Sequence, residues 1–525
     1  MESIHWYDKT LTLLDGVNLV SRIWVPKEGD GPWPALLMRQ PYGREIASTV
    51  TFNHPAWWAE QGYLVIIQDV RGQGGSDGTF IGFKQEASDT TQTHKWVRSL
   101  AECNGLLGTY GFSYQGLTQL LGEPNSQPPD CLAPAMTGLD ECAHWSCDGG
   151  AFWWHLGLAW GLQLAALQAR RKGNIKGWDK IRSCLEDGSY LQEGPSILKE
   201  YDPKGMALDW LNRSNKQKQE WAVHEPLASW LRQPMLLIGG WWDPHLRGVL
   251  EIYKKSIQAG GFPELHVGPA THLQWWDESQ QLLLSFFNKH LRSPRSSTSP
   301  KAIQKLWNIT SKSWQSLTTS TTPSTIWGLS SQGEACLNSN DGSLNPNSNG
   351  KGIVNLVHDP WRPVPAIGGH LSPKPGPVDR QQLDIRSDVA IFTSPQLQEN
   401  LHLEGIPILK LIVEGDKDGF DICTALSVVN EERTKSEQIS TGILRVLDTQ
   451  AIKNTPREVI FQAIVADLKK GQHLRIAIAG SSWPAIGINP GDKSKSIGAP
   501  SAHCNVITMT LQLAYSNFRV LPLLS

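Results

Sequence analysis

Short, continuous apolar runs that end in turn residues mark the first part of the chain. Ala35–Met38, Tyr63–Asp69 and Leu106–Tyr110 are such runs, and Pro234–Gly240 and Glu264–Gly268 repeat the pattern further on. A run without polar alternation is typical of a strand that is buried on both faces of a parallel sheet. Helix-compatible sequence separates several of these runs. We therefore predict βαβ units and a mostly parallel sheet.

The strand signals vanish between about Ala143 and Trp230. Phe152–Ala169 is apolar and helix-prone, and Lys176–Leu185 and Tyr201–Trp221 also favour helices. We interpret this stretch as a helical insertion that would cap an active site. The predicted α/β domain thus has two parts, residues 1–142 and 231–292, on either side of the insertion at 143–230.

The sequence changes character after His290. Residues 292–300 form a polar, proline-containing linker, and short β-prone pieces follow, among them Val389–Thr393, Ile408–Val413 and His473–Ile478. Turn residues separate these pieces, and no long amphipathic helix lies between them. We predict an all-β sandwich of the jelly-roll type for residues 301–525 and a loop for the Asn/Ser/Gly-rich segment 333–351.

Composition narrows the classes of function. Of 525 residues, 40% are hydrophobic and 19% charged, and the formal net charge is −2, so no basic surface for nucleic acid is indicated. The start of the chain lacks the basic and apolar parts of a signal peptide, and no apolar stretch has the length of a membrane span. The eight cysteines are scattered without a CxxC pair, which favours reduced thiols over disulfides or zinc. We expect a cytoplasmic protein without nucleic-acid or membrane partners, and leave homo-oligomer formation open.

The sharpest chemical signal is Gly111-Phe112-Ser113-Tyr114-Gln115-Gly116. It follows an apolar strand and precedes a helix-compatible run, which is the context of a nucleophile elbow. The string alone is weak, because glycine stands three positions after the serine in place of two. For the string taken alone, an ordinary turn is the better interpretation.

Two later residues complete the pattern of a serine hydrolase. Asp243 follows one predicted strand and His272 follows the next, so the chain order is Ser, Asp, His, as in α/β-hydrolases. Both lie where α/β proteins place their sites, at the carboxyl ends of strands. His245 comes too soon after the acid, and His266 falls within a strand.

The predicted catalysis needs donors for a tetrahedral oxyanion. The backbone N–H of Tyr114 is one candidate, and the Tyr42 hydroxyl, in the loop after an early strand, is the other. Tryptophan occurs 23 times, and the doublets Trp153-Trp154 and Trp241-Trp242 lie near the predicted cap and the predicted acid. These four rings are candidates for the wall of a substrate pocket.

The loop Asp69-Val70-Arg71-Gly72-Gln73-Gly74 also follows a strand. Its glycines do not form a G-x-G-x-x-G string, so nucleotide binding is not indicated. We interpret it as a structural loop in which Asp69 and Arg71 make hydrogen bonds.

Together the motifs RQPYG, QDVRGQGGSDG and GFSYQG resemble those of the CocE/NonD hydrolases. That family includes cocaine esterase, X-prolyl dipeptidyl-peptidases and α-amino-acid ester hydrolases, and its elbow is itself G-x-S-Y-x-G. The resemblance continues in HDPWRPVP, SDVAIFTS and GQHLR of the C-terminal part. It implies Ser113, Asp243 and His272 as the triad, and the Tyr42 hydroxyl and Tyr114 amide as oxyanion donors.

We therefore predict a serine hydrolase that cleaves a small ester or amide through an acyl-enzyme, without a metal or other cofactor. An X-Pro dipeptidyl-peptidase is the first alternative, and it would need a carboxylate for the substrate ammonium. Asp140 and Asp148 are candidates for that role, although loop or capping roles are the commoner ones. The second alternative is a non-catalytic binding protein on a hydrolase scaffold.

Overall fold

The computed structural model describes residues 5–46, 51–213, 221–293, 301–317 and 325–524. The chain divides into two compact units. Unit 1 comprises residues 1–145, 159–240 and 245–305, and unit 2 comprises residues 146–158, 241–244 and 306–525. Part of the predicted linker (294–300) lies outside the described residues.

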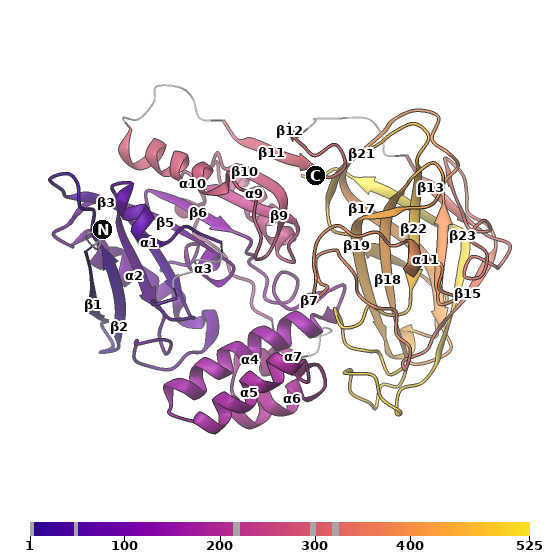
Figure 1. The fold of residues 1–525 in the computed structure, drawn as a ribbon, viewed down its shortest axis with the longest axis horizontal. Coiled ribbons are helices and arrows are strands. Elements are labelled where there is room, and N and C mark those ends of the chain that lie inside the picture. Colours follow the sequence, from indigo (N-terminus) through magenta and orange to yellow (C-terminus); the bar gives the residue numbers. More distant parts are fainter. Residues whose placement is uncertain (1–4, 47–50, 214–220, 294–300, 318–324, 525) are drawn as a thin grey trace. The chain divides into compact units, whose positions relative to one another are not determined.

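A twisted sheet forms the centre of unit 1 (Figure 1). Its strands run in the order β1-β2-β4-β3-β5-β6-β9-β10. Pairing is parallel from β4 through β3, β5 and β6 to β9, while β1 and β2 form an antiparallel hairpin at one edge. The bounds are β1 (Trp6–Thr12), β2 (Asn18–Trp24), β3 (Trp33–Gln40), β4 (Leu64–Asp69), β5 (Cys103–Phe112), β6 (Cys131–Ala135), β9 (Leu236–Trp242) and β10 (Glu264–Thr271). The predicted parallel sheet is confirmed, and each of the five apolar runs forms a strand.

Helices cover both faces of this sheet, which explains the continuous apolar runs. In β3, Leu36 and Met38 pack in one core cluster with Phe287 of α10, whereas Ala35 and Leu37 pack on the opposite face. Successive side chains of a strand point to opposite faces, so both faces must be apolar. The helices that flank the sheet are α1 (Pro55–Glu60), α2 (Glu86–Arg98), α3 (Tyr114–Thr118), α9 (Leu246–Gln258) and α10 (Ser279–Phe287).

The predicted insertion is mainly helical, and its longer helices α4 to α7 gather in a group of their own (Figure 1). The helices of this group are α4 (Trp154–Arg171), α5 (Ile175–Asp187), α6 (Tyr190–Tyr201) and α7 (Met206–Asn212). The insertion also contains the short helix α8 (Ala228–Leu231). Two details differ from the prediction. The short strands β7 (Cys147–Asp148) and β8 (Ala151–Phe152) pair here. The helix predicted over Tyr201–Trp221 is limited to α7 among the described residues, and 214–220 lie outside them.

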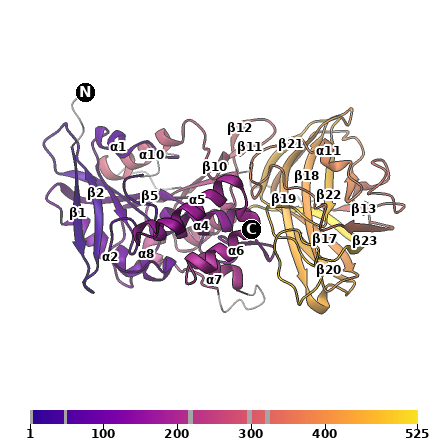
Figure 2. The same cartoon turned by 60° about the horizontal axis from the view of Figure 1, so that its bottom comes forward.

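Unit 2 is a β-sandwich domain, as predicted, and Figure 2 shows its long strands. The main path runs β19-β18-β22-β16-β14-β13-β23-β17-β20. The strands of this sheet are β13 (Trp327–Ser330), β14 (Ser343–Pro346), β15 (Ile353–His358), β16 (Val389–Thr393), β17 (Leu401–Gly415), β18 (Gly419–Val429), β19 (Ser436–Leu447), β20 (Thr455–Ile460), β21 (Ile464–Leu468), β22 (His473–Ala479) and β23 (Ile507–Leu521), and α11 (Gln381–Asp384) is a single turn. The strands β11 (Ile303–Asn308) and β12 (Ser313–Ser316) precede them in the chain and are not part of this sheet. The loop predicted for 333–351 contains β14, so that prediction is wrong there.

The segment 146–158 belongs to unit 2 because it bonds to the sandwich. The carboxylate of Asp148 lies 3.0 Å from Nε2 of His370. Trp153 forms a β-bridge with Ile486, and the Trp154 amide donates to the Ala485 carbonyl at 2.9 Å. The first residues of α4 are thus held by sandwich residues.

All eight cysteines are free thiols, which agrees with the sequence prediction. Among the residues that the structure describes, no helix is both long and apolar enough to cross a membrane.

Candidate active site

Ser113 lies on a tight turn between β5 and α3. Its backbone has φ 58° and ψ −127°, a conformation that costs a side-chain-bearing residue free energy and that is found at functional turns. Its amide donates to the carbonyl of Ala135 at 3.0 Å. A Cβ on Gly111 would lie 2.4 Å from Cβ of Gln115, and one on Gly116 would lie 2.9 Å from the Ala135 oxygen. Both glycines are therefore required by the turn, which has the geometry of a nucleophile elbow.

The hydroxyl of Tyr42, two residues beyond β3, lies close enough to the Ser113 side chain for that side chain to lower its pKa. It also accepts a hydrogen bond from Nε1 of Trp160 in α4, at 3.1 Å. Burial raises the pKa of Tyr42 to about 12, so this hydroxyl keeps its proton at neutral pH. The sequence analysis missed Trp160, because nothing in the apolar α4 distinguishes it from the other tryptophans.

Tyr114 is anchored through its side chain. Its hydroxyl donates to Oε1 of Glu86 at 2.8 Å, and its ring stacks on that of Phe83, with centroids 4.6 Å apart. The other carboxylate oxygen of Glu86 accepts from Nη1 of Arg39 at 2.6 Å, and both side chains of this ion pair are buried. Within the described residues no acceptor bonds the Tyr114 amide, which stands at the first position of α3.

His272 directly follows β10, as predicted. Its ring centroid lies 5.1 Å from that of Phe112, the residue before Ser113. It also lies 5.0 Å from the ring of His245, whose Nδ1 is bonded to the His144 carbonyl at 2.7 Å. The fold of unit 1 thus brings His272 to the carboxyl end of β5, next to the elbow.

Asp243 follows the last residue of β9 and is fully buried. Its main-chain oxygen accepts a hydrogen bond from Nε2 of Gln462 at 2.6 Å. Nearby in the chain, Nε1 of Trp241 donates to the Trp307 carbonyl at 2.6 Å. Residues 241–244 are part of unit 2 through these contacts. Gln462 is 219 positions away in sequence, and no local signal points to it.

Comparison with known proteins gives the family. The model of the X-Pro dipeptidyl-peptidase (S15) family matches residues 15–274, and that of the X-Pro dipeptidyl-peptidase C-terminal non-catalytic domain matches residues 288–512. A cocaine esterase from Rhodococcus sp. (strain MB1 Bresler) is 24% identical over 481 residues, which cover 84% of this chain and 83% of that protein. Among solved structures, an α-amino acid ester hydrolase has a TM-score of 0.71 at 18% identity, covering 99% of this chain and 97% of that one. A CocE/NonD family hydrolase from Staphylococcus aureus has a TM-score of 0.69 at 18% identity, covering 98% and 92%.

The chain belongs to the CocE/NonD family of hydrolases. The predicted family and fold class are therefore confirmed. The residue boundaries 1–142, 143–230, 231–292 and 301–525 stay predictions. So do the roles assigned to the individual site residues.

The four tryptophans predicted to wall a substrate pocket of this hydrolase are all buried in unit 2. Trp153 packs in a core cluster with Cys423 and Ile443 of the sandwich, and the Trp154 ring lies against Gly487. Trp241 uses its indole N–H on a main-chain carbonyl. These contacts are those of core residues, and they lend no support to a pocket formed by Trp153, Trp154, Trp241 and Trp242.

A row of aromatic rings does lie beside Tyr42 in unit 1. The Trp160 ring centroid is 6.3 Å from that of Trp145 and 5.8 Å from that of Trp210. Trp145 in turn lies 5.0 Å from Phe83 and 4.6 Å from His245. These tryptophans are isolated in the sequence, unlike the doublets, and only tertiary packing brings them together.

The acids considered for a substrate ammonium have partners within the protein. Oδ1 of Asp140 accepts from the amides of Cys142 and Ala143, at 2.8 and 2.9 Å, which is a turn-capping role. The Asp148 carboxylate is bonded to His370. The commoner role expected from the sequence is therefore the one that these contacts support.

The loop at Asp69 is structural, as predicted. The carboxylate of Asp69 forms an ion pair with Arg44 at 2.8 Å, and Arg71 forms one with Asp89 at 2.7 Å. A Cβ on Gly74 would lie 2.3 Å from the Asp69 carboxylate, so this glycine is needed for the loop to fold around it.

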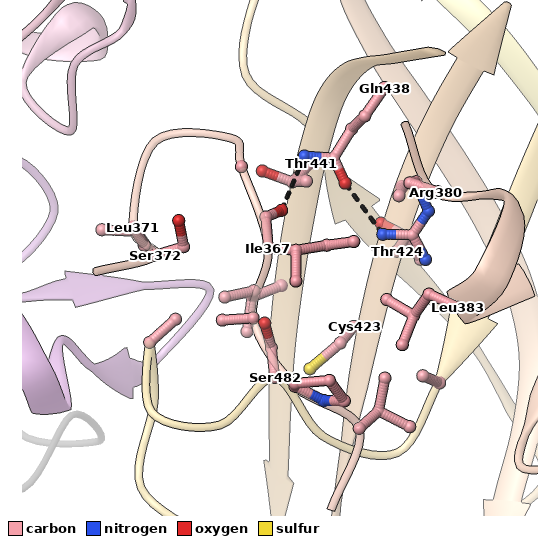
Figure 3. A pocket seen from close by; sticks show the side chains of 18 of the residues that line it. Ile367, Leu371, Ser372, Arg380, Leu383, Cys423, Thr424, Gln438, Thr441 and Ser482 are labelled. Atoms are coloured by element: carbon pink, nitrogen blue, oxygen red, sulfur yellow. Dashed lines mark hydrogen bonds between the residues drawn. The ribbon is translucent and has the colours of Figure 1, made fainter. Parts of the chain in front are cut away.

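A cavity within unit 2 is lined by none of the predicted site residues (Figure 3). Polar side chains in its lining bond to one another. Nη1 of Arg380 donates to Oε1 of Gln438 at 2.8 Å, and Nε2 of Gln438 donates to the Ile367 carbonyl at 3.0 Å. We assign it no role in the hydrolase reaction.

Proposed function

We propose that this hydrolase cleaves acyl esters with Ser113 as nucleophile, His272 as general base and Asp243 as the acid that orients the histidine. The observation that carries the proposal is the strained elbow that presents Ser113 at the carboxyl end of β5, with the protonated hydroxyl of Tyr42 close to it. A serine hydroxyl attacks only when a base removes its proton, and the position of His272 beside Phe112 supports that assignment.

The proposed reaction has two halves. His272 takes the proton of Ser113 as Oγ bonds to the substrate carbonyl carbon, and the oxyanion receives hydrogen bonds from the Tyr42 hydroxyl and the Tyr114 amide. The tetrahedral intermediate then breaks its bond to the leaving alcohol, which His272 protonates. Water repeats the sequence on the acyl-enzyme, releases the acid and restores Ser113. Removing one oxyanion donor should lower kcat about a hundredfold to a thousandfold.

An ester is favoured over a peptide with a free amino terminus. Recognition of a terminal ammonium needs a carboxylate without a partner of its own, and Asp140 and Asp148 both have partners. The aromatic row beside Tyr42 favours an apolar group on the substrate. The proteins named cocaine esterase and α-amino acid ester hydrolase, to which the chain is similar, also favour ester chemistry. The S15 family description keeps X-Pro peptide cleavage as the alternative.

The test compares wild type with Ser113→Ala on p-nitrophenyl esters of increasing acyl size and on Xaa-Pro p-nitroanilides. We expect ester turnover that is lost in the variant, and labelling of wild type alone by a fluorophosphonate. Preferential turnover of the anilides would replace the esterase assignment with the peptidase one. A folded wild type that turns over neither and resists labelling would refute the catalytic proposal and favour a binding scaffold.

A further inference from the structure

We infer that Trp160 is a positioning residue whose indole N–H directs the Tyr42 hydroxyl proton toward the reacting oxygen. The inference rests on the proposed function and names a residue on which its oxyanion donor depends. The observation is the hydrogen bond from Nε1 of Trp160 to the phenolic oxygen of Tyr42, at 3.1 Å.

The direction of this bond decides what Tyr42 can do. An indole N–H can only donate, so Tyr42 must be the acceptor. The phenol has a single proton, and that proton cannot point at another donor. The other side chain that acts on the hydroxyl is Ser113. Because the indole occupies one side of the phenolic oxygen, the Tyr42 proton is directed away from Trp160 and is available to a reacting oxygen at Ser113.

The same bond helps when charge develops on the substrate. An oxyanion donor is effective when it is already oriented, since no reorganisation is then needed during the reaction. As the Tyr42 proton is drawn toward the oxyanion, negative charge grows on the phenolic oxygen. The indole N–H stabilises that charge, and it accordingly lowers the pKa of Tyr42 in opposition to burial.

The indole can perform this role because its own position is fixed. Trp160 packs against the rings of both Trp145 and Trp210. Each of those rings is held by its own N–H, which donates to the Gly138 carbonyl at 2.8 Å in one case and to Glu141 at 3.1 Å in the other. A half-buried ring that packs against two anchored neighbours has little freedom to turn away from Tyr42.

The test uses Trp160→Phe, which keeps an aromatic ring and removes the donor. Trp221→Phe is the matched control: its ring contacts Trp210, with centroids 6.2 Å apart, it lies outside the row beside Tyr42, and its Nε1 has no partner within the described residues. Trp160 is also replaced by 3-benzothienylalanine, in which sulfur takes the place of N–H and the ring keeps its shape. Both changes are combined with Tyr42→Phe, and kcat and KM are measured on the preferred ester.

We expect kcat to fall about threefold to tenfold in both Trp160 variants, the effect of one hydrogen bond, and KM to stay nearly unchanged in the benzothienyl variant, whose ring keeps its shape. Trp221→Phe should stay within twofold of wild type. In the Tyr42→Phe background the Trp160 changes should have no further effect. An equal loss in both backgrounds, or no loss with the benzothienyl residue in an active enzyme, overturns this inference alone. Absence of turnover in wild type overturns the proposed function and this inference with it.

Discussion

His144 should make unit 1 sensitive to acid. Its ring is buried, and Nδ1 accepts hydrogen bonds from the backbone amides of Leu139 and Asp140, at 3.2 and 3.1 Å. A proton on Nδ1 would face these two donors, so the folded protein holds the neutral ring with its proton on Nε2, toward Glu251 at 3.3 Å. Burial lowers the pKa of His144 to about 4, with a further lowering by Arg247 and a partial offset by Asp140.

The sign and size of the effect follow from this pKa. The unfolded chain titrates near the ordinary histidine value of about 6.5, so between that pH and 4 it binds a proton that the folded state does not. Stability is therefore complete above the unfolded pKa and falls as the pH is lowered through it. Between pH 7.5 and 4.5, His144 alone should reduce the free energy of unfolding by about 2.5 kcal/mol.

The assay is urea denaturation of wild type and His144→Asn at both pH values. Asparagine places an acceptor oxygen where Nδ1 stood and cannot titrate. The variant loses ring packing at every pH, but its loss of stability between the two pH values should be about 2.5 kcal/mol smaller than that of wild type. The other histidines contribute equally to the pH dependence of wild type and variant, so their effects cancel when the two are compared. His503→Asn, at an exposed site, is the control and should show the same pH dependence of the free energy of unfolding as wild type. An equal pH dependence in wild type and His144→Asn would refute the reasoning.

Three further substitutions test the site. Gly116→Ala should reduce the free energy of unfolding by about 1–3 kcal/mol and lower Tm, because its Cβ would press on the neighbouring strand; an unchanged Tm would contradict the elbow geometry. Gln462→Met leaves the Asp243 carbonyl without its donor, and we expect kcat to fall roughly tenfold, which a steady-state assay on the preferred ester measures. Glu86→Gln leaves the buried Arg39 without its counter-charge and should cost about 3–5 kcal/mol in urea denaturation, most of it recovered when Arg39→Met is added.

Much of the fold of unit 1 could be predicted from the sequence because its strands are buried on both faces. Continuous apolar runs mark such strands, although the predicted ends at Tyr110 and Gly268 fall two and three residues before the ends of β5 and β10. The end of β9 was placed at Gly240, two residues early, because a Trp-Trp pair looks less like a strand than like the start of a loop. The predicted order of the strand ends was unaffected by this error.

Other features depend on tertiary contacts that leave no local pattern. β14 is rich in asparagine and serine, and only Leu344 in it is a buried apolar residue; it forms a strand because β13 and β16 supply its partners. Trp160 and Gln462 became candidates only when the fold brought them to Tyr42 and Asp243. A tryptophan that donates one specific hydrogen bond has no sequence signature that separates it from one that fills a core.

The C-terminal part of the chain matches a family description that calls it non-catalytic, yet its Gln462 donates a hydrogen bond to the main chain of Asp243. Residues 241–244 and 146–158 come from the α/β part of the sequence, but they are compact with the sandwich. The reason is physical: a buried carbonyl must find a donor, and Gln462 donates to the carbonyl of Asp243. "Non-catalytic" then means that the sandwich supplies no reacting group. The proposed acid still depends on the sandwich for its position, because the hydrogen bond to its main chain would be lost without Gln462.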